Sequence, residues 1–216
     1  MMKEFLPGEE IELALAGSVS LELTWVAPLK IWAATCAVSN REFRCFEPGH
    51  RSGELDGCSL DTDDQPAVNV SWDNARRFAL WVHDKFGSTL PEGFRFRLPG
   101  EMEWESYARC EPMSAPIWGD RCPGSGNFAV IEQMRIGWGV PPPCREAPRN
   151  AWGLYGVDGG IWEWVDDLFD PTMNRRNLRG ACWCGMGPEG FQVLYHRTPT
   201  PERGHPNFGF RIVAGM

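Results

Sequence analysis

The sequence lacks any run of 18 apolar residues, so it contains no segment long enough to cross a bilayer as a helix. It also lacks an excess of basic residues: the net charge is -8, whereas phosphate binding needs a basic face. Nucleic acid is therefore excluded as the main partner. The first 17 residues carry four glutamates where a signal peptide needs an apolar segment, which predicts a cytoplasmic protein. A leader removed from a longer chain would leave secretion or surface display open.

Several common catalytic and metal-binding motifs are also missing. No two of the eight cysteines form a CxxC pair, which argues against a zinc ribbon. There is no nucleophile elbow, phosphate loop or paired-carboxylate motif. The four histidines include no closely spaced pair and stand at His50, His83, His196 and His205. We expect the cysteines of a cytoplasmic protein to be reduced, although their even number leaves disulfides open.

Tryptophan and glycine, in contrast, are abundant, with 11 and 24 residues. This composition favours an irregular, loop-rich fold in which indole rings hold the loops together. At 216 residues the chain can bury one substantial core. We therefore expect a single domain over residues 1–216, with residues 1–15 as a lead-in.

Helical periodicity is clearest at residues 69–86, where Ser71 is the expected N-cap and Gly87 ends the helix. A second helix is predicted over residues 101–109, and a short one begins with Ser39 or Asn40 as its cap. Alternating apolar and polar residues and short apolar runs predict strands at residues 19–26, 29–36, 94–98, 177–181 and 208–214. Loop or ordered coil is predicted for the polar and Pro- or Gly-rich stretches at residues 50–65 and 111–149.

The stretch NAWGLYGVDGGIWEWVDD, residues 150–167, has neither helical nor strand periodicity throughout. Trp162 and Trp164 are two residues apart, as on one face of an extended segment, with Glu163 on the other face. Two interpretations follow. In the first, the tryptophans are core anchors and Glu163 caps nearby backbone amides. In the second, Glu163 and the carbonyls of the glycine turn bind a hard cation such as calcium.

Four sequence blocks and a closing motif resemble a known family. GLYGVDGGIWEWVDDL (153–168) resembles the GLYDMxGNVWEWxxD signature of the formylglycine-generating enzyme family, also called the sulfatase-modifying factor family. PAVNVSWDNARRFALW (66–81), FRLPGEMEW (96–104) and LRGACW (178–183) resemble its PVxxVSWxDAxxFCxW, YRLPTEAEWE and LRGGSW blocks, and GFR closes the set at 209–211. The resemblance covers nearly the whole chain. It implies an α+β fold of the irregular C-type-lectin-like kind, with two helices, small antiparallel sheets and much ordered coil.

The resemblance implies two kinds of chemistry. Formylglycine-generating enzymes oxidise a substrate cysteine with copper(I) held by two of their own cysteines, but Gly185 and Gly190 occupy those positions here. Copper is therefore not expected, although Cys182 and Cys184 leave a displaced soft-metal or redox site open. The sulfoxide synthases of the family place iron on histidines of an additional helical domain, which this sequence lacks. The enzymatic alternative is a metal-dependent oxidase or oxygenase acting on a cysteine or another sulfur or peptide substrate.

A third possibility is binding without chemistry. The variable proteins of diversity-generating retroelements share the fold and carry their variable residues between the GxW block and the closing GFR. RGACW and GFR enclose such a segment here, and its mixture of aromatic, amide and imidazole groups suits recognition of a protein or small-molecule ligand. The predicted binding residues are Trp183, Cys184, Met186, Glu189, Phe191, Gln192, Leu194, Tyr195, His196, Glu202 and His205. The other non-enzymatic alternative is a fixed binding or accessory module with an ordinary loop.

The resemblance also implies a structural calcium ion within residues 150–167, with ligands at Gly156, Gly159, Ile161 and Glu163. The family has Asn or Asp where Gly156 stands, so the site would depend on carbonyls, water or Asp158. A second calcium site would need an asparagine such as Asn127 and a later aspartate, which the stretch IEQMRIGWGVPPP does not contain.

Overall fold

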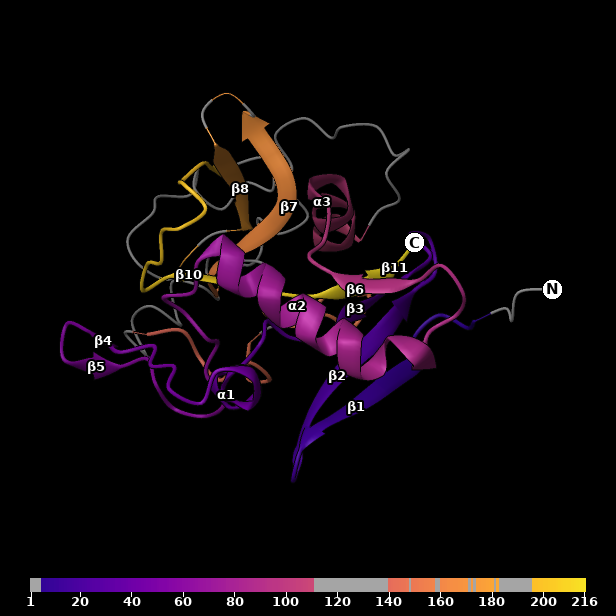
Figure 1. Cartoon of the computed structure of the whole chain (residues 1–216), viewed down its shortest axis with the longest axis horizontal. Coiled ribbons are helices and arrows are strands. Elements are labelled where there is room, and N and C mark those ends of the chain that lie inside the picture. Colours follow the sequence, from indigo (N-terminus) through magenta and orange to yellow (C-terminus); the bar gives the residue numbers. More distant parts are fainter. Residues whose placement is uncertain are drawn as a thin grey trace.

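The computed structural model describes residues 5–110, 140–147, 149–157, 160–170, 172, 174–180, 182 and 196–216. Two larger sheets, a small hairpin and three α-helices make up this part of the chain (Figure 1). The arrangement confirms the expected α+β fold with short elements and much coil. Most of the coil predicted over residues 111–149 lies outside the described residues. None of the described helices is long and apolar enough to cross a membrane.

The first sheet has five strands in the order β1 (Glu10–Ala16), β2 (Val19–Val26), β3 (Ile31–Ala34), β11 (Val213–Gly215) and β6 (Arg95–Arg97). All neighbouring pairs are antiparallel, and C-terminal β11 lies between β3 and β6. The two ends of the chain therefore share one sheet. Strand β1 corrects the lead-in expected over residues 1–15, because Leu13 and Leu15 bury their side chains in the core.

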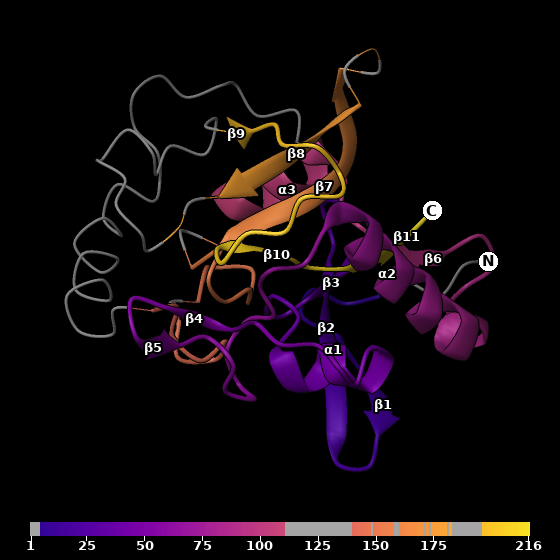
Figure 2. The same cartoon turned by 60° about the vertical axis from the view of Figure 1, so that its left-hand side comes forward.

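The second sheet has the order β10 (Phe208–Phe210), β7 (Trp162–Asp170), β8 (Arg175–Gly180) and β9 (His196–Arg197). It stands apart from the β1–β2 hairpin, which projects on the opposite side of the molecule (Figure 2). Strands β7 and β8 are antiparallel, whereas β10 runs parallel to β7. The strand predicted over residues 208–214 is thus divided, with β10 in this sheet and β11 in the first. Arg211 and Ile212 make the crossing between the sheets, and both are buried.

The helices are α1 (Asn40–Phe46), α2 (Trp72–Phe86) and α3 (Glu101–Arg109), with a 3-10 turn, η1 (Gly87–Thr89), after α2. The hydroxyls of Ser39 and Ser71 accept the backbone N–H groups of Glu42 and Asn74, which confirms both expected N-caps. Helix α2 lies across the first sheet (Figure 1) and buries its predicted apolar face of Ala75, Phe78, Ala79 and Val82. The resemblance implied two helices, and α1 is the short third one placed by the sequence at Ser39.

Residues 50–65, expected as a loop, are held in place largely by polar side chains. They contain the hairpin of β4 (Glu54–Leu55) and β5 (Cys58–Ser59). The buried amide of Asn40 donates to the carbonyls of Leu60 and Thr62 at 2.8 Å each. The hydroxyl of Ser52 donates to Asn40 Oδ1 at 2.6 Å. These bonds satisfy backbone groups that an irregular segment would otherwise leave unpaired.

Candidate functional site

The predicted binding segment is anchored on both sides of one tryptophan. Trp162 on β7 is paired with Gly180 at the end of β8 and with Phe208 at the start of β10. The segment between Gly180 and Phe208 therefore connects the two flanks of β7, and its residues His196 and Arg197 form β9 at the edge of the same sheet. Trp162, Trp164 and Phe210 are 0% exposed, so the base of the segment is a closed part of the core.

Two glycines at these anchor points occupy positions where a side chain would be unfavourable. A Cβ on Gly209 would lie 2.5 Å from both the Ala67 carbonyl oxygen and Ile161 Cδ1, which is closer than real side chains approach. Gly180 has a φ of +100° and stands where a Cβ would be 3.2 Å from the Ile161 carbonyl oxygen. A side chain at position 209 would clash with its neighbours, whereas one at position 180 would need a strained backbone and a small shift of its neighbours.

Most of the predicted binding residues fall outside the part of the chain that the structure describes. Those residues are Trp183, Cys184, Met186, Glu189, Phe191, Gln192, Leu194 and Tyr195. For His196 the backbone is described, as the first residue of β9. Glu202 is exposed and Glu202 Oε1 lies 3.5 Å from Asn174 Nδ2.

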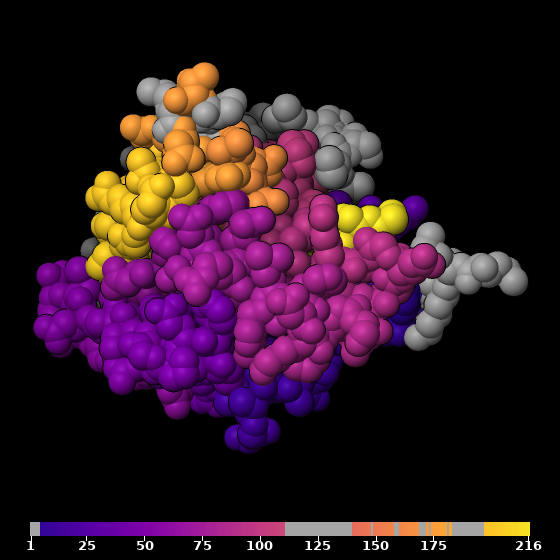
Figure 3. Space-filling view, viewed as in Figure 1, coloured from indigo at the N-terminus to yellow at the C-terminus, as the bar shows by residue number. Residues whose placement is uncertain are grey.

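His205, the last predicted binding residue, is half-buried and its carbonyl accepts the amides of Asn69 and Phe208 at 2.9 Å. Its imidazole Nδ1 is hydrogen-bonded to Asn207 Oδ1. In the space-filling view the residues before β10 lie on the surface beside the β7–β8 hairpin, with 202–204 exposed (Figure 3). Hydrogen bonds of His205 thus hold the C-terminal end of the segment, while Glu202 faces solvent.

Glu163, the predicted calcium ligand, is 1% exposed and pairs with Arg211, which is 0% exposed. Arg211 donates from Nη2 to Glu163 Oε1 at 3.0 Å and from Nε to Oε2 at 3.2 Å. The indole of Trp104 donates to Oε2 at 2.9 Å. A guanidinium already supplies the positive charge that calcium would bring, so this carboxylate does not fit the ligand role.

The other calcium ligands expected from the sequence are only partly described. Gly156 adopts a φ of +67° in the turn before β7, and the backbone of Ile161 is described, but Gly159 lies outside the described residues. Within the described part of the chain, no three His, Cys, Asp or Glu side chains gather as a metal ion would require. The sequence contains no local sign that Arg211 is the partner of Glu163, because 48 residues separate the two.

A charged network lies beside the strand that leads into the binding segment. Arg179 on β8 has a side chain only 3% exposed and bonds Glu105 on α3 at 2.8 Å, with Glu101 at 3.5 Å. Burial lowers the pKa of Arg179, and the two glutamates oppose that change. Cys182, which follows on the chain, is buried, as a space-filling cysteine would be. Cys184, the other half of the displaced pair, is outside the described residues.

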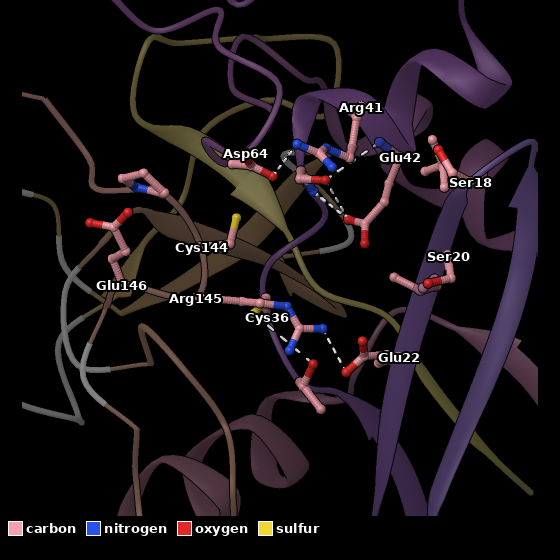
Figure 4. Close-up of a pocket in the computed structure, with 15 residues that line it drawn as sticks. Ser18, Ser20, Glu22, Cys36, Arg41, Glu42, Asp64, Cys144, Arg145 and Glu146 are labelled. Carbon is pink, nitrogen blue, oxygen red and sulfur yellow. Dashed lines mark hydrogen bonds and ion pairs between the residues drawn. The ribbon is translucent and has the colours of Figure 1, made fainter.

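A separate cleft of about 360 Å³ opens between the start of β2, the segment leading into α1, and residues 143–146 (Figure 4). Two ion pairs lie in its walls, Arg41 with Asp64 and Arg145 with Glu22. The thiols of Cys36 and Cys144 and the carboxylate of Glu42 also line it. No local signal in the sequence predicts this cleft, because its walls come from four separate parts of the chain.

Burial sets the protonation of the groups in this cleft. It raises the pKa of the Cys144 thiol well above its usual range and raises that of Cys36, so both are protonated at neutral pH. Burial also raises the pKa of Glu42, although hydrogen bonds from Ser39 lower it in part. The Cys144 thiol donates to the Ala37 carbonyl at 3.5 Å.

Comparison with known proteins matches residues 22–216 to the model of the sulfatase-modifying factor enzyme 1-like domain. An inactive C-alpha-formylglycine-generating enzyme 2 of Bos taurus is 30% identical over 161 residues, covering 69% of this chain and 50% of the relative. The formylglycine-generating enzyme of Thermomonospora curvata is 32% identical over 195 residues, covering 76% of this chain and 60% of the relative. The chain thus spans about half the length of the relatives it matches.

Two solved structures share the fold over almost their whole length. Treponema denticola variable protein 1 superposes with a TM-score of 0.69 at 16% identity, covering 94% of this chain and 98% of that one. PvdO from Pseudomonas aeruginosa gives a TM-score of 0.66 at 19% identity, covering 98% and 93%. At such low identity these likenesses establish the fold and nothing about activity.

Proposed function

The chain belongs to the sulfatase-modifying factor enzyme 1-like family, and from this premise we propose that it is a ligand-binding protein whose recognition surface is residues 183–208. The proposal follows the pattern of the variable proteins of diversity-generating retroelements, in which a changeable segment is carried on a constant frame. The ligand would be a protein or a small molecule held by exposed aromatic, amide and imidazole side chains.

The observation that carries this proposal is the anchoring of the segment around Trp162. Its two ends pair with opposite flanks of the same strand, and their immediate neighbours are fully buried. Strand β9 and the carbonyls of Thr198, Pro199 and Pro201 attach the end of the segment to the rest of the fold. These attachments use the backbone of the segment, so they do not depend on which side chains it carries. Substitutions within the segment can then change a binding surface with little effect on folding, as surface positions usually allow.

A second argument comes from the residues that copper chemistry would need. Gly185 and Gly190 stand where the resemblance places the copper cysteines, and glycine supplies no thiolate. A relative named inactive formylglycine-generating enzyme is also 30% identical over much of this chain, so the family includes proteins named as inactive. Both points favour binding over oxidation of a cysteine.

The enzymatic alternative rests on the relatives named as formylglycine-generating enzymes, one of them 32% identical. It is tested by anaerobic titration with copper(I) and by mass spectrometry of a CxPxR peptide incubated with the protein. We expect no one-to-one copper complex and no conversion of the peptide. Tight stoichiometric binding lost in Cys184→Ser would support the enzyme instead.

The proposal itself is tested by sequencing the gene from many cells of one population. We expect substitutions to gather in the codons for residues 184–207, with the codons for 160–180 and 208–216 constant. Substitutions spread evenly over the gene would contradict a changeable surface on a constant frame. A segment as constant as its frame, with ligand binding retained, would favour the fixed binding module.

A further inference from the structure

The cleft lined by Cys36, Glu42, Cys144 and Arg145 shares no residue with the binding segment and has no part in the function proposed above. Its volume of about 360 Å³ would hold a small molecule or the end of one long side chain. Hydroxyl groups from Ser20 and Thr35 contribute to its walls. The cleft is therefore polar as well as concave.

Glu42 has one carboxylate oxygen that is still available. Its Oε2 accepts both the backbone N–H of Ser39 at 2.6 Å and the Ser39 hydroxyl at 2.8 Å, which closes the capping box of α1. Among the described residues none donates a hydrogen bond to Oε1. In Figure 4 the carboxylate of Glu42 points into the middle of the cleft, with Arg145 below it and Ser18 and Ser20 at the side.

The charges of the cleft leave this carboxylate without a cation of its own. Arg41 is paired with Asp64, and Arg145 is paired with Glu22 at 2.6 Å. Both guanidinium groups lower the pKa of Glu42, but neither forms an ion pair with it. Counting the lining side chains, the acids Glu22, Glu42, Asp64 and Glu146 outnumber the bases Arg41 and Arg145. An anionic ligand would meet a surplus of negative charge here, whereas a cation would reduce it.

We propose that this cleft binds the primary ammonium group of a small amine or of a lysine side chain, with Glu42 Oε1 as the acceptor. An ammonium group has three donors and no acceptor, which suits a carboxylate oxygen in a cleft that serine and threonine hydroxyls also line. Binding relieves the cost that burial places on the Glu42 charge. The two protonated thiols form part of the wall and take no part in the recognition.

The test is titration of the isotope-labelled full chain with two amines, followed by NMR. One probe is 1,4-diaminobutane, and the other is a lysine tripeptide with blocked ends. Each is compared with its fully N-acetylated form, which has lost the positive charge. We expect amide shifts at Ser20, Cys36 and Glu42 with an amine and none with the acetylated forms. Binding of the diamine alone would identify a free amine as the ligand, and binding of the tripeptide would extend the site to lysine side chains.

Two matched variants then test whether amine binding requires the charge of Glu42. Glu42→Gln keeps the capping-box acceptor but removes the charge, and should weaken amine binding by at least about tenfold, as expected for one charge-assisted hydrogen bond. Glu146→Gln removes an equal charge from the exposed rim and should bind almost as the wild type does. Equal binding by Glu42→Gln, equal binding of the acetylated probes, or no shifts with the wild type would overturn the proposal. The wild-type shifts decide the matter even if Glu42→Gln does not fold.

Discussion

Replacing Glu163 with glutamine should lower the free energy of unfolding by about 3 to 5 kcal/mol, the usual cost of removing one partner from a buried ion pair. Glutamine keeps the shape of the side chain and an acceptor for the Trp104 indole. It removes the negative charge that faces Arg211. With the two side chains 1% and 0% exposed, water cannot replace that charge.

Other hydrogen bonds keep Arg211 in place when the negative charge of Glu163 is removed. Beyond Glu163, its guanidinium donates to the carbonyls of Ala34 at 2.8 Å, Thr35 at 3.0 Å and Tyr155 at 2.7 Å. These bonds hold it at the crossing between the two sheets. The charge therefore stays buried when its partner becomes neutral, and the desolvation cost is no longer offset.

Urea unfolding with linear extrapolation measures the effect, provided that the slope is unchanged by the substitution. The control is Asp64→Asn, which breaks an ion pair whose side chains are 42% and 63% exposed and should cost no more than about 1 kcal/mol. The double variant Glu163→Gln/Arg211→Met should lose less than the sum of the two single variants. Additive losses would show that the two residues act independently.

The same samples also address calcium. Because Arg211 balances the charge of Glu163, EDTA should leave the melting temperature of the wild type unchanged. A loss of more than about 2 kcal/mol on adding EDTA, absent from Glu163→Gln, would instead assign the carboxylate to a bound metal ion. A cost for Glu163→Gln as small as that of the control would show that the buried pair does not stabilise the fold.

Three further outcomes are expected. Alkylation by iodoacetamide at pH 7.5 should label exposed Cys58 well before Cys144, whose thiol pKa is raised by burial. Raising the pH should reduce the difference between the two labelling rates. Equal rates at pH 7.5, measured by mass spectrometry, would contradict this expectation. Burial raises the pKa of Glu103, but the hydrogen bonds and charge of Arg97 outweigh burial and leave the pKa lowered. Stability should therefore fall as the pH drops below about 4.5, and it should fall less steeply in Glu103→Gln. Identical acid unfolding curves for the two proteins would show that protonation of Glu103 is not linked to unfolding. Gly209→Ala should lower the free energy of unfolding by about 1 to 3 kcal/mol or more. Gly49→Ala should lower it little, because nothing lies within 4 Å of the added Cβ. Equal denaturation midpoints for the two variants would disprove the close contact at position 209.

Local patterns in the sequence predict the elements that depend on neighbouring residues. Ser71 caps α2 as expected, and the apolar face of that helix is the predicted one, because cap and period lie within a few turns. Strand β2 coincides with the predicted residues 19–26 because alternation alone specifies it.

Other features depend on residues that meet only in the folded chain. The insertion of β11 between β3 and β6 joins the ends of the chain, and no local pattern encodes that pairing. Strand β1 was expected as a lead-in because alternating glutamates hide the buried Leu13 and Leu15. The sequence predicts a special role for Glu163, but only the folded chain brings its partner Arg211 beside it.

A substitution scan of residues 160–211, sorted by resistance of the folded protein to protease, shows whether the proposed binding positions are free to vary. Every residue of the proposed surface is varied singly and scored against the frame beneath it. Most substitutions at Met186, Gln192, Leu194 and the other proposed binding positions should leave the protein folded. Substitutions at Trp162, Phe208, Gly209 and Phe210 should unfold it. Binding positions as intolerant as these four would show that they are built into an enclosed pocket, and would contradict a display surface.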